Sequence, residues 1–254
     1  MINGKKIVAT IEARMTSTRL PGKVMLPLAG KSNMERLIER LKRSRYIDDV
    51  VIATTTNATD DVLEQLAHEL GVGIWRGSED DVLGRVLGAA QSVNADLIVE
   101  VTGDCPLIDW RHVDHIVELF ATGQWDYVAN NTERTFPRGL DLQIFPTAVL
   151  AEVDRITQDP VDRENVSIYI YTHKERYRCY NWSAEGRMHR PDLRITLDTK
   201  EDYDLINTIF ERLLPVNPDF SAEDIITLLE QEPELMEINR EIKQKNPYGG
   251  YLAQ

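Results

Sequence analysis

The amino-acid sequence predicts an α/β protein in which a mostly parallel sheet lies between two layers of helices. In the first half of the chain, short apolar runs that suit buried strands alternate with segments whose apolar residues recur every three or four positions. This alternation is typical of βαβ units, which give parallel strands with helices on both faces. The 254 residues suffice for one full hydrophobic core, and no repeat or low-complexity linker divides them. We therefore predict a single domain over residues 1–254.

Each element of the first half follows from its local pattern. Residues 5–11 and 96–102 are apolar runs that suit central strands, and residues 50–54 form a shorter run rich in β-branched side chains. Asn33 is a candidate N-cap for the first helix, and Gly71 is placed to end the second. Helices are expected where apolar residues recur with helical spacing, at residues 34–41, 63–70, 80–93 and 113–120.

The alternation of strand and helix stops after Asp126. Residues 136–139, Phe-Pro-Arg-Gly, predict a turn, and residues 140–145 alternate like a half-buried strand. The same patterns predict strands at residues 178–182 and 194–197, helices at residues 149–157, 163–174, 200–214 and 222–231, and a loop at residues 246–251. The domain thus divides into residues 1–125, a middle section at 126–199 that faces a substrate, and a C-terminal helical cover at 200–254.

Composition narrows the classes of function. The 42 acidic residues against 29 lysines and arginines give a net charge of −13, which argues against general binding to nucleic acid or anionic membranes. No apolar stretch is long enough to span a membrane, and the N-terminus lacks a signal-peptide pattern. Cys105 and Cys179 show neither metal-ligand spacing nor a disulfide framework. We predict a soluble cytoplasmic protein that binds neither nucleic acid nor membrane.

A cationic loop follows the first predicted strand. Residues 12–23 read Glu-Ala-Arg-Met-Thr-Ser-Thr-Arg-Leu-Pro-Gly-Lys, which places Arg14, Arg19 and Lys23 close together in an otherwise acidic chain. Guanidinium groups, an ammonium group and loop N–H groups are all donors to phosphate oxygens. The loop therefore predicts a polyanion site, and a nucleoside triphosphate is the obvious ligand.

Other polar segments follow other predicted strands. Ligands of open α/β sheets bind beyond the carboxyl ends of the strands, so we expect residues 14–23, 54–56 and 103–104 to meet at one crevice. Asp104 follows a glycine that permits close approach and is suited to Mg²⁺. Asp198 is a second candidate carboxylate, although its local sequence favours a helix N-cap. Cations for phosphates and a carboxylate for Mg²⁺ together indicate phosphoryl or nucleotidyl transfer.

The loop at residues 13–23 closely resembles the A-R-x-x-S-T-R-L-P-G-K signature of the sugar-acid cytidylyltransferases. These include the 3-deoxy-manno-octulosonate and acylneuraminate cytidylyltransferases, and this chain is most similar to the spore-coat polysaccharide branch. An eleven-residue loop joined by further blocks in family order is a specific signal. The resemblance covers roughly residues 5–210, and its further blocks are residues 76–83, 102–109, 136–141, 162–164 and 197–202.

The resemblance implies a nucleotide-diphospho-sugar transferase-like (Rossmann-like) fold, CTP and a sugar acid as substrates, Mg²⁺, a CMP-activated sugar product and a homodimer. It implies that residues 1–125 bind CTP and that residues 126–199 bind the acceptor and form the dimer. The resemblance implies that Arg14, Lys23 and Asp104 are the catalytic residues. By position, Ala13, Arg14, Arg19, Lys23, Arg85 and Thr102 would contact the nucleotide, Asp104 and Asp198 the metal, and Arg138, Asp141, Gln143 and Asn165 the acceptor.

Some readings stay open. Family members usually carry His after Asp-Arg-Glu, but here the residue is Asn165, so the identity of the acceptor is open. Arg138 reads either as a fork for the acceptor's carboxylate or as a surface turn cation. His112 and His115 share one predicted helix, where ordinary helix residues are a better reading than a metal pair. The alternative functions are nucleotidyl transfer to a sugar 1-phosphate or polyol phosphate, and non-catalytic nucleotide binding.

Overall fold

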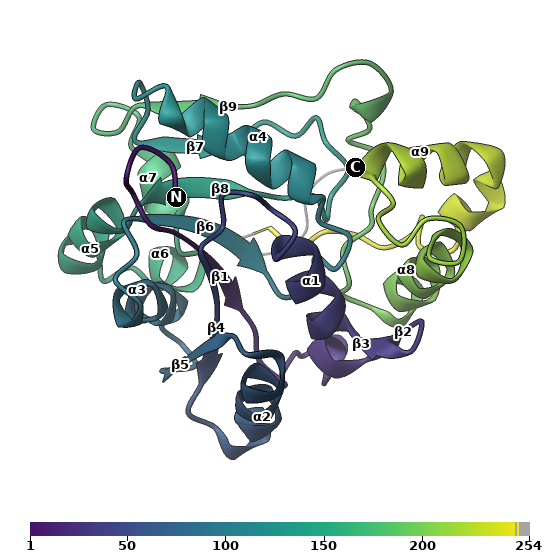
Figure 1. Ribbon diagram of the computed structural model, residues 1–254, viewed down its shortest axis with the longest axis horizontal. Coiled ribbons are helices and arrows are strands. Elements are labelled where there is room, and N and C mark those ends of the chain that lie inside the picture. Colours follow the sequence, from purple (N-terminus) through teal and green to yellow (C-terminus); the bar gives the residue numbers. More distant parts are fainter. Residues whose placement is uncertain (247, 249–254) are drawn as a thin grey trace.

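A seven-stranded sheet forms the centre of the molecule (Figure 1). The structure is a computed structural model that describes residues 1–246 and 248. Among these residues, β8 alone runs antiparallel to its neighbours in the sheet, which confirms the predicted mostly parallel α/β class. In spatial order the strands are β5 (Gly73–Gly77), β4 (Asp49–Thr55), β1 (Ile7–Glu12), β6 (Leu97–Thr102), β8 (Gln143–Pro146), β7 (Tyr127–Ala129) and β9 (Cys179–Asn181).

Helices cover both faces of this sheet. Side chains alternate along β1, so Ile7, Ala9 and Ile11 lie on one face while Val8 lies on the other. The first face packs against α1 (Asn33–Leu41), α2 (Asp61–Leu70) and α4 (Trp110–Ala121), and the second against α3 (Val82–Ser92), α5 (Thr147–Ile156) and α7 (Ile168–Thr172). The predicted three layers are therefore confirmed.

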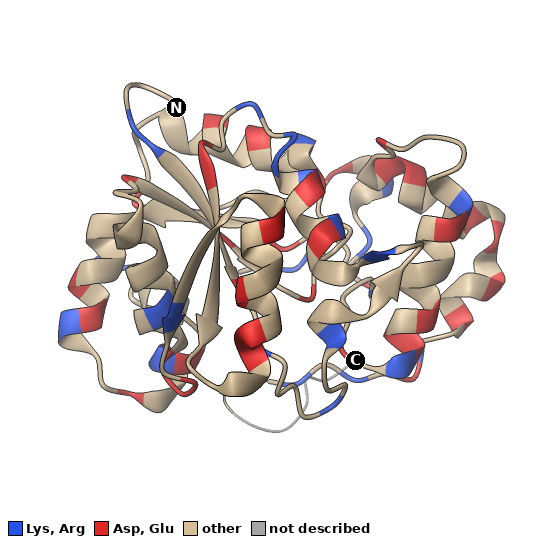
Figure 2. Cartoon of the chain, turned by 60° about the horizontal axis from the view of Figure 1, so that its bottom comes forward, with Lys and Arg blue, Asp and Glu red and all other residues tan. Residues whose placement is uncertain are grey.

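The C-terminal helices form a separate hydrophobic cluster beside the sheet. Helix α8 (Lys200–Leu213) and helix α9 (Ala222–Gln231) pack on each other and on Phe136, and α8 also contacts the short strand β2 (Pro27–Leu28), which pairs with β3 (Lys31–Ser32) (Figure 1). Charged residues gather on the outer helices and loops, and the central sheet is largely uncharged (Figure 2). Among the described residues, no helix has both the length and the apolar character needed to cross a membrane.

Several sequence-based expectations were wrong in detail. Strands β5 and β7 were not predicted. Residues 163–174 are not one helix but α6 (Pro160–Glu164) and α7, because Val166 between them takes a left-handed backbone with φ of 50°. Residues 194–197 are not a strand, since only one isolated bridge pairs Arg194 with Arg138. Of the predicted loop at 246–251, residues 247 and 249–251 lie outside the described residues.

Two predicted helix caps were also displaced by one residue. Ser32, not Asn33, caps α1, and it forms a capping box with Glu35. Thr199, not Asp198, caps α8, so the cap reading of Asp198 was wrong. One-residue displacements of this kind are common because Ser, Thr, Asn and Asp are all good caps. The displacement matters at Asp198, whose carboxylate is left free for another role.

Candidate active site

A cleft of about 970 Å³ opens beyond the carboxyl ends of β1 and β6. Most of the sequence-predicted site residues converge on it, and Asp141 is the exception. Those that line it are Ala13, Arg14, Arg19, Lys23, Arg85, Thr102, Asp104, Arg138, Gln143, Asn165 and Asp198. Residues 54–56, which we expected at the same crevice, are not among its lining residues.

Buried Asp60 explains both the shape of the cationic loop and the position of the threonines. Its Oδ1 accepts a hydrogen bond from the N–H of Met15 at 2.8 Å, and its Oδ2 accepts from the hydroxyls of Thr54 at 2.9 Å and Thr55 at 2.6 Å. The N–H of Gly22 closes the loop by donating to the carbonyl oxygen of Met15 at 2.8 Å. The threonines therefore hold the anchor of the loop rather than facing the ligand.

Lys23 lies between the two carboxylates that were predicted to hold a metal. Its Nζ is 2.8 Å from Oδ2 of Asp104 and 2.8 Å from Oδ1 of Asp198. Burial disfavours the ammonium, but the charges of Asp104 and Asp198 outweigh burial and raise the pKa of Lys23. For Asp198, burial acts in the opposite sense, yet Lys23, Arg19 and Arg194 hold its pKa well below the usual range. The chain thus places a positive charge where two acidic side chains meet.

Three cations hold the carboxylate of Asp198. Nη2 of Arg19 forms an ion pair with its Oδ1 at 2.8 Å, and Arg194 donates to its Oδ2 at 2.9 Å while also binding Asp202. The neighbouring backbone is joined to Asp104, because the N–H of Leu197 donates to the carbonyl oxygen of Asp104 at 2.8 Å. The two carboxylates therefore keep their relative positions without any ligand.

Gly103 brings β6 close to the cationic loop. A Cβ at this position would lie 3.0 Å from the carbonyl oxygen of Glu12 and 3.1 Å from Cβ of Ala13. Beside it, the hydroxyl of Thr102 donates to Oδ1 of Asp104 at 2.5 Å. The close approach that the sequence predicted for this glycine is confirmed, and it sets Asp104 against the loop.

Arg14 is engaged by an acidic residue that the sequence analysis did not identify. Its Nη1 is 2.9 Å from Oε1 of Glu79, which also accepts from the hydroxyl of Thr16 at 2.6 Å. Hydrogen bonds from Thr16 and Asn57, with the charge of Arg14, lower the pKa of Glu79. Both side chains of the pair are about one third exposed, at 37% and 34%. Such a pair is weak enough for a ligand to displace.

Arg138 leaves its charge free at the cleft. Among the described residues it forms no ion pair, and burial together with the charge of Arg134 lowers the pKa of Arg138 to about 10. Gly139 fixes the turn, because its φ is 109° and a Cβ there would lie 2.5 Å from the carbonyl oxygen of Ile195. Arg138 is partly buried and lines the cleft, so the structure does not favour the reading as an exposed surface cation.

The other predicted acceptor residues differ in position. Gln143 and Asn165 line the cleft, and Asn165 donates to the carbonyl oxygen of Val161 at 2.8 Å. Asp141 does not line it. Both of its carboxylate oxygens are held by Arg134, one of them at 2.7 Å, and Arg134 itself reaches the cleft. Sequence spacing could not distinguish a residue that faces the ligand from one that positions its neighbour.

The sequence analysis missed other lining residues as site residues, and four of them bear on the chemistry of the cleft. Glu12 and Glu100 come from β1 and β6, and Gln244 and Lys245 come from the C-terminal segment. Glu100 interrupts the apolar run of residues 97–101, and a charged residue inside a buried strand is a signal that could have identified it. Gln244 accepts from Arg194 at 2.5 Å, so the C-terminal segment reaches the same arginine that holds Asp198.

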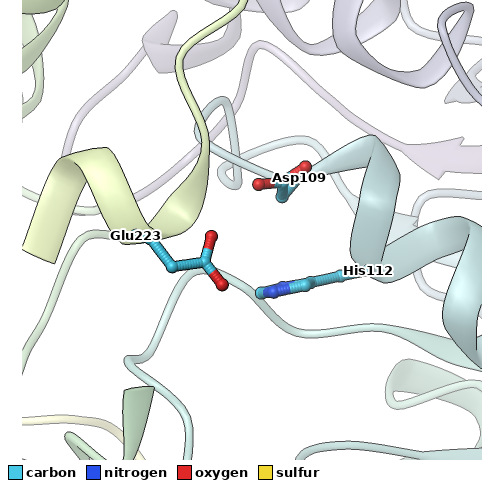
Figure 3. Close-up of side chains that lie close together, drawn as sticks. All are labelled: Asp109, His112 and Glu223. Atoms are coloured by element: carbon cyan, nitrogen blue, oxygen red, sulfur yellow. The ribbon is translucent and has the colours of Figure 1, made fainter. Parts of the chain in front are cut away.

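Asp109, His112 and Glu223 form a second cluster of polar side chains (Figure 3), and none of the three lines the cleft. One of its two carboxylates is already in use, because Asp109 caps α4 and accepts from the N–H of Ala222 at 2.7 Å. Burial lowers the pKa of His112, whose ring packs 5.2 Å from that of Trp182. These contacts join α4 to α9 and agree with a structural reading of the histidine.

The cleft therefore combines a cationic loop with two acidic side chains that meet on one lysine. Cations bind the phosphates of a nucleotide, and carboxylate oxygens are the ligands that Mg²⁺ prefers. Together with the parallel sheet, this arrangement is that of an enzyme that handles nucleotide phosphates.

Comparison with known proteins identifies the family. The cytidylyltransferase family profile matches residues 8–248. The chain is 33% identical to an uncharacterised protein of Methanocaldococcus jannaschii over 95% of this chain and 97% of that protein. It is 34% identical to the spore coat polysaccharide biosynthesis protein SpsF of Bacillus subtilis over 90% and 95% of the two chains.

Solved structures agree. A cytidylyltransferase from Leptospira borgpetersenii is 35% identical, superimposes with a TM-score of 0.87, and covers 94% of this chain and 100% of its own. A CMP:2-keto-3-deoxy-manno-octonic acid synthetase complexed with CTP shares the fold, with 17% identity, a TM-score of 0.63, and coverage of 82% and 99%. The chain belongs to the cytidylyltransferase family and is a CTP-dependent nucleotidyltransferase.

Proposed function

We propose that this enzyme transfers CMP from CTP to a sugar acid and releases pyrophosphate, for the synthesis of a surface polysaccharide or glycan. The observation that carries the proposal is one cleft in which Arg14, Arg19 and Lys23 face Asp104 and Asp198 while Arg138 stands uncompensated. The relative from Bacillus subtilis that is named for spore coat polysaccharide biosynthesis supports the biological context. A 3-deoxy-manno-octulosonate cytidylyltransferase of Geobacter sulfurreducens, 36% identical over 45% of this chain, supports the sugar-acid class.

Each part of the cleft has a task in this reaction. A hydroxyl of the acceptor forms a bond to the α-phosphorus of CTP, and the bond from that phosphorus to the bridging oxygen breaks as pyrophosphate leaves. Arg14, Arg19 and Lys23 neutralise the negative charge of the departing group. For this, Lys23 moves its ammonium from the carboxylates to the phosphates and Arg14 leaves Glu79. Arg138 pairs with the carboxylate of the acceptor in a two-pronged contact.

The residues also fit a divalent cation. Oxygens of Asp104 and Asp198 contact the same ammonium of Lys23, so a positive charge is already favoured where they meet, and oxygen ligands suit Mg²⁺. Mg²⁺ held there by the two carboxylates would supply charge to the phosphate oxygens. We further propose that the enzyme is cytoplasmic and forms a homodimer. Size-exclusion chromatography with light scattering tests the homodimer.

A coupled pyrophosphate assay tests the reaction. CTP with ulosonic and nonulosonic acids should release pyrophosphate, whereas sugar 1-phosphates and polyol phosphates should not. Turnover only with sugar 1-phosphates or polyol phosphates would favour nucleotidyl transfer to those acceptors. Binding of CTP without turnover of any acceptor would favour a non-catalytic role. Asp104→Ala should abolish turnover while the fold remains, and Asp204→Ala, which changes an exposed acid on α8, is the matched control. Near-normal turnover of Asp104→Ala with saturating Mg²⁺ would refute the metal assignment.

A further inference from the structure

Two carboxyl groups in the cleft have no task in the reaction proposed above. Glu12 ends β1 and Glu100 lies in β6, the adjacent parallel strand. The register pairs Thr10 with Glu100 and Glu12 with Thr102, so these side chains share the face of the sheet that packs against α3. Both glutamates line the cleft. The fold therefore places two acids side by side where a substrate can reach them.

Polar atoms around this pair lack protein partners. Glu100 is 3% exposed, and Oε2 of Glu12 and Oε2 of Glu100 are buried without a hydrogen bond within the described chain. The hydroxyl of Thr10 and Nε of Arg85 are in the same state. Buried polar groups are nearly always hydrogen-bonded, since burial without a partner is costly. Three of these atoms belong to residues that line the cleft, Glu12, Arg85 and Glu100, and they indicate a ligand that completes their bonds.

The charge balance specifies what the ligand offers. Arg85 on α3 is the neighbouring cation, but its Nη1 donates to the carbonyl oxygens of Ser78 at 2.6 Å and Glu79 at 2.8 Å. Asp104 adds further negative charge, and the nearby Tyr127 and Tyr171 are neutral phenols. Burial and the charge of Glu100 raise the pKa of Glu12, and burial raises that of Glu100 to about 8. The hydroxyl of Ser167, which also lines the cleft, is a hydrogen-bonding neighbour of Glu100 and acts against this rise in its pKa. Even with Ser167 and Arg85 nearby, the Oε2 atoms of both glutamates lack a donor within the described chain.

We propose that Glu12 and Glu100 determine acceptor specificity by binding a hydrogen-bond-donating substituent of the sugar acid, an ammonium or a hydroxyl group. This inference rests on the proposed function. The acceptor then has two contacts of opposite charge. Arg138 binds its carboxylate, and the glutamate pair accepts hydrogen bonds from its donor group. An ammonium would donate hydrogen bonds to both glutamates and balance their negative charge. A hydroxyl would donate to one carboxylate oxygen, and the two glutamates would then share one proton between them.

Steady-state kinetics with CTP and three sugar acids tests the proposal. The probes are 3-deoxy-manno-octulosonate, which offers hydroxyls, its 8-amino-8-deoxy analogue, which offers an ammonium, and N-acetylneuraminate, in which the nitrogen is acylated. The variants are Glu12→Gln, Glu100→Gln and Glu100→Leu, with Glu39→Gln on the outer surface of α1 as the control. We expect the KM for the preferred acceptor to rise at least tenfold in Glu100→Leu, with the KM for CTP within twofold of wild type.

The Gln variants separate the two donor groups. If the acceptor donates through a hydroxyl, the amide oxygen of Glu100→Gln replaces the carboxylate and the KM changes less than threefold. If it donates through an ammonium, loss of the charge in Glu12→Gln and Glu100→Gln raises the KM tenfold or more.

Two outcomes would overturn the inference, and they differ. Should wild type turn over a sugar acid while Glu100→Leu keeps its KM within twofold, the glutamates are not specificity determinants and the proposed function stands. If Glu100→Leu does not fold, Glu12→Leu takes its place, because leucine removes the acceptor oxygens that glutamine would keep. Should wild type bind CTP but turn over no sugar acid, the proposed function fails and the inference fails with it.

Discussion

Replacing Lys23 by methionine should destabilise the free enzyme and increase its response to Mg²⁺. The Nζ of Lys23 lies 2.8 Å from each of two carboxylates, and the side chain is 12% exposed. Removing one partner of a buried ion pair costs about 3–5 kcal/mol. Asp104 is 21% exposed, so we take the lower limit of about 3 kcal/mol. In a chain of this size, that corresponds to a fall in Tm of about 6–12 °C.

The same variant should recover stability with Mg²⁺ more than wild type does. Without the ammonium, the carboxylates of Asp104 and Asp198 repel each other, and a cation that binds the folded state adds stability by mass action. Lys31→Met is the matched control, because Lys31 is 44% exposed and its ion pair with Glu39 is worth at most about 1 kcal/mol. Scanning fluorimetry with Mg²⁺ or with a chelator measures both effects.

The pH dependence of this difference follows from Asp198. Its pKa is depressed below the ordinary value of 3.8, so its ion pairs contribute stability that is present above pH 3.8 and is lost as the pH falls through the lower folded-state pKa. The difference in Tm between wild type and Lys23→Met should therefore shrink below about pH 4. Equal Tm values and equal Mg²⁺ responses for Lys23→Met and Lys31→Met at pH 7 would refute the reasoning.

Three further outcomes are expected. Between pH 5 and 8, the free energy of unfolding of Glu100→Gln should rise relative to wild type by about 1 kcal/mol per pH unit. The reason is that the pKa of Glu100 in the folded protein is about 8, so wild type keeps a proton that its unfolded chain releases. Chemical unfolding measures this difference, and a difference that does not change with pH would contradict it. Gly139→Ala should lower the free energy of unfolding by about 3 kcal/mol, since its Cβ would meet the carbonyl oxygen of Ile195 at 2.5 Å; urea midpoints measure it, and an unchanged midpoint would show that the turn relaxes. Glu79→Gln should tighten CTP binding up to about fivefold in calorimetry by releasing Arg14; weaker binding would show that Glu79 positions Arg14 instead.

The local sequence pattern was sufficient to predict the long helices and the central strands. Residues 222–231 were predicted with the bounds that α9 has, because apolar side chains at helical spacing pack on one neighbouring surface. Strand β5 escaped prediction because its two glycines and Arg76 give no apolar run, and its pairing with β4 is non-local. The break between α6 and α7 depends on a left-handed Val166, which sequence patterns do not indicate.

The candidate site shows the same division. The cationic loop and Asp104 were readable, since each is a short motif at the end of a strand. Whether Asp198 caps a helix or faces the cleft depended on a one-residue difference in which side chain the helix N-terminus uses. The Glu12 and Glu100 pair was invisible along the chain because only the strand register brings the two residues together.

The backbone hydrogen bond between Leu197 and Asp104 affects how loss-of-function variants should be interpreted. It ties the α8–α9 cluster, to which Leu197 belongs, to the candidate site, so we expect a packing defect at Phe210 or Ile226 to shift Asp198. In a mutational scan, substitutions in that remote cluster will resemble active-site lesions even when the protein remains folded. To distinguish packing defects from changes in the site, the abundance of each variant must be measured together with its activity.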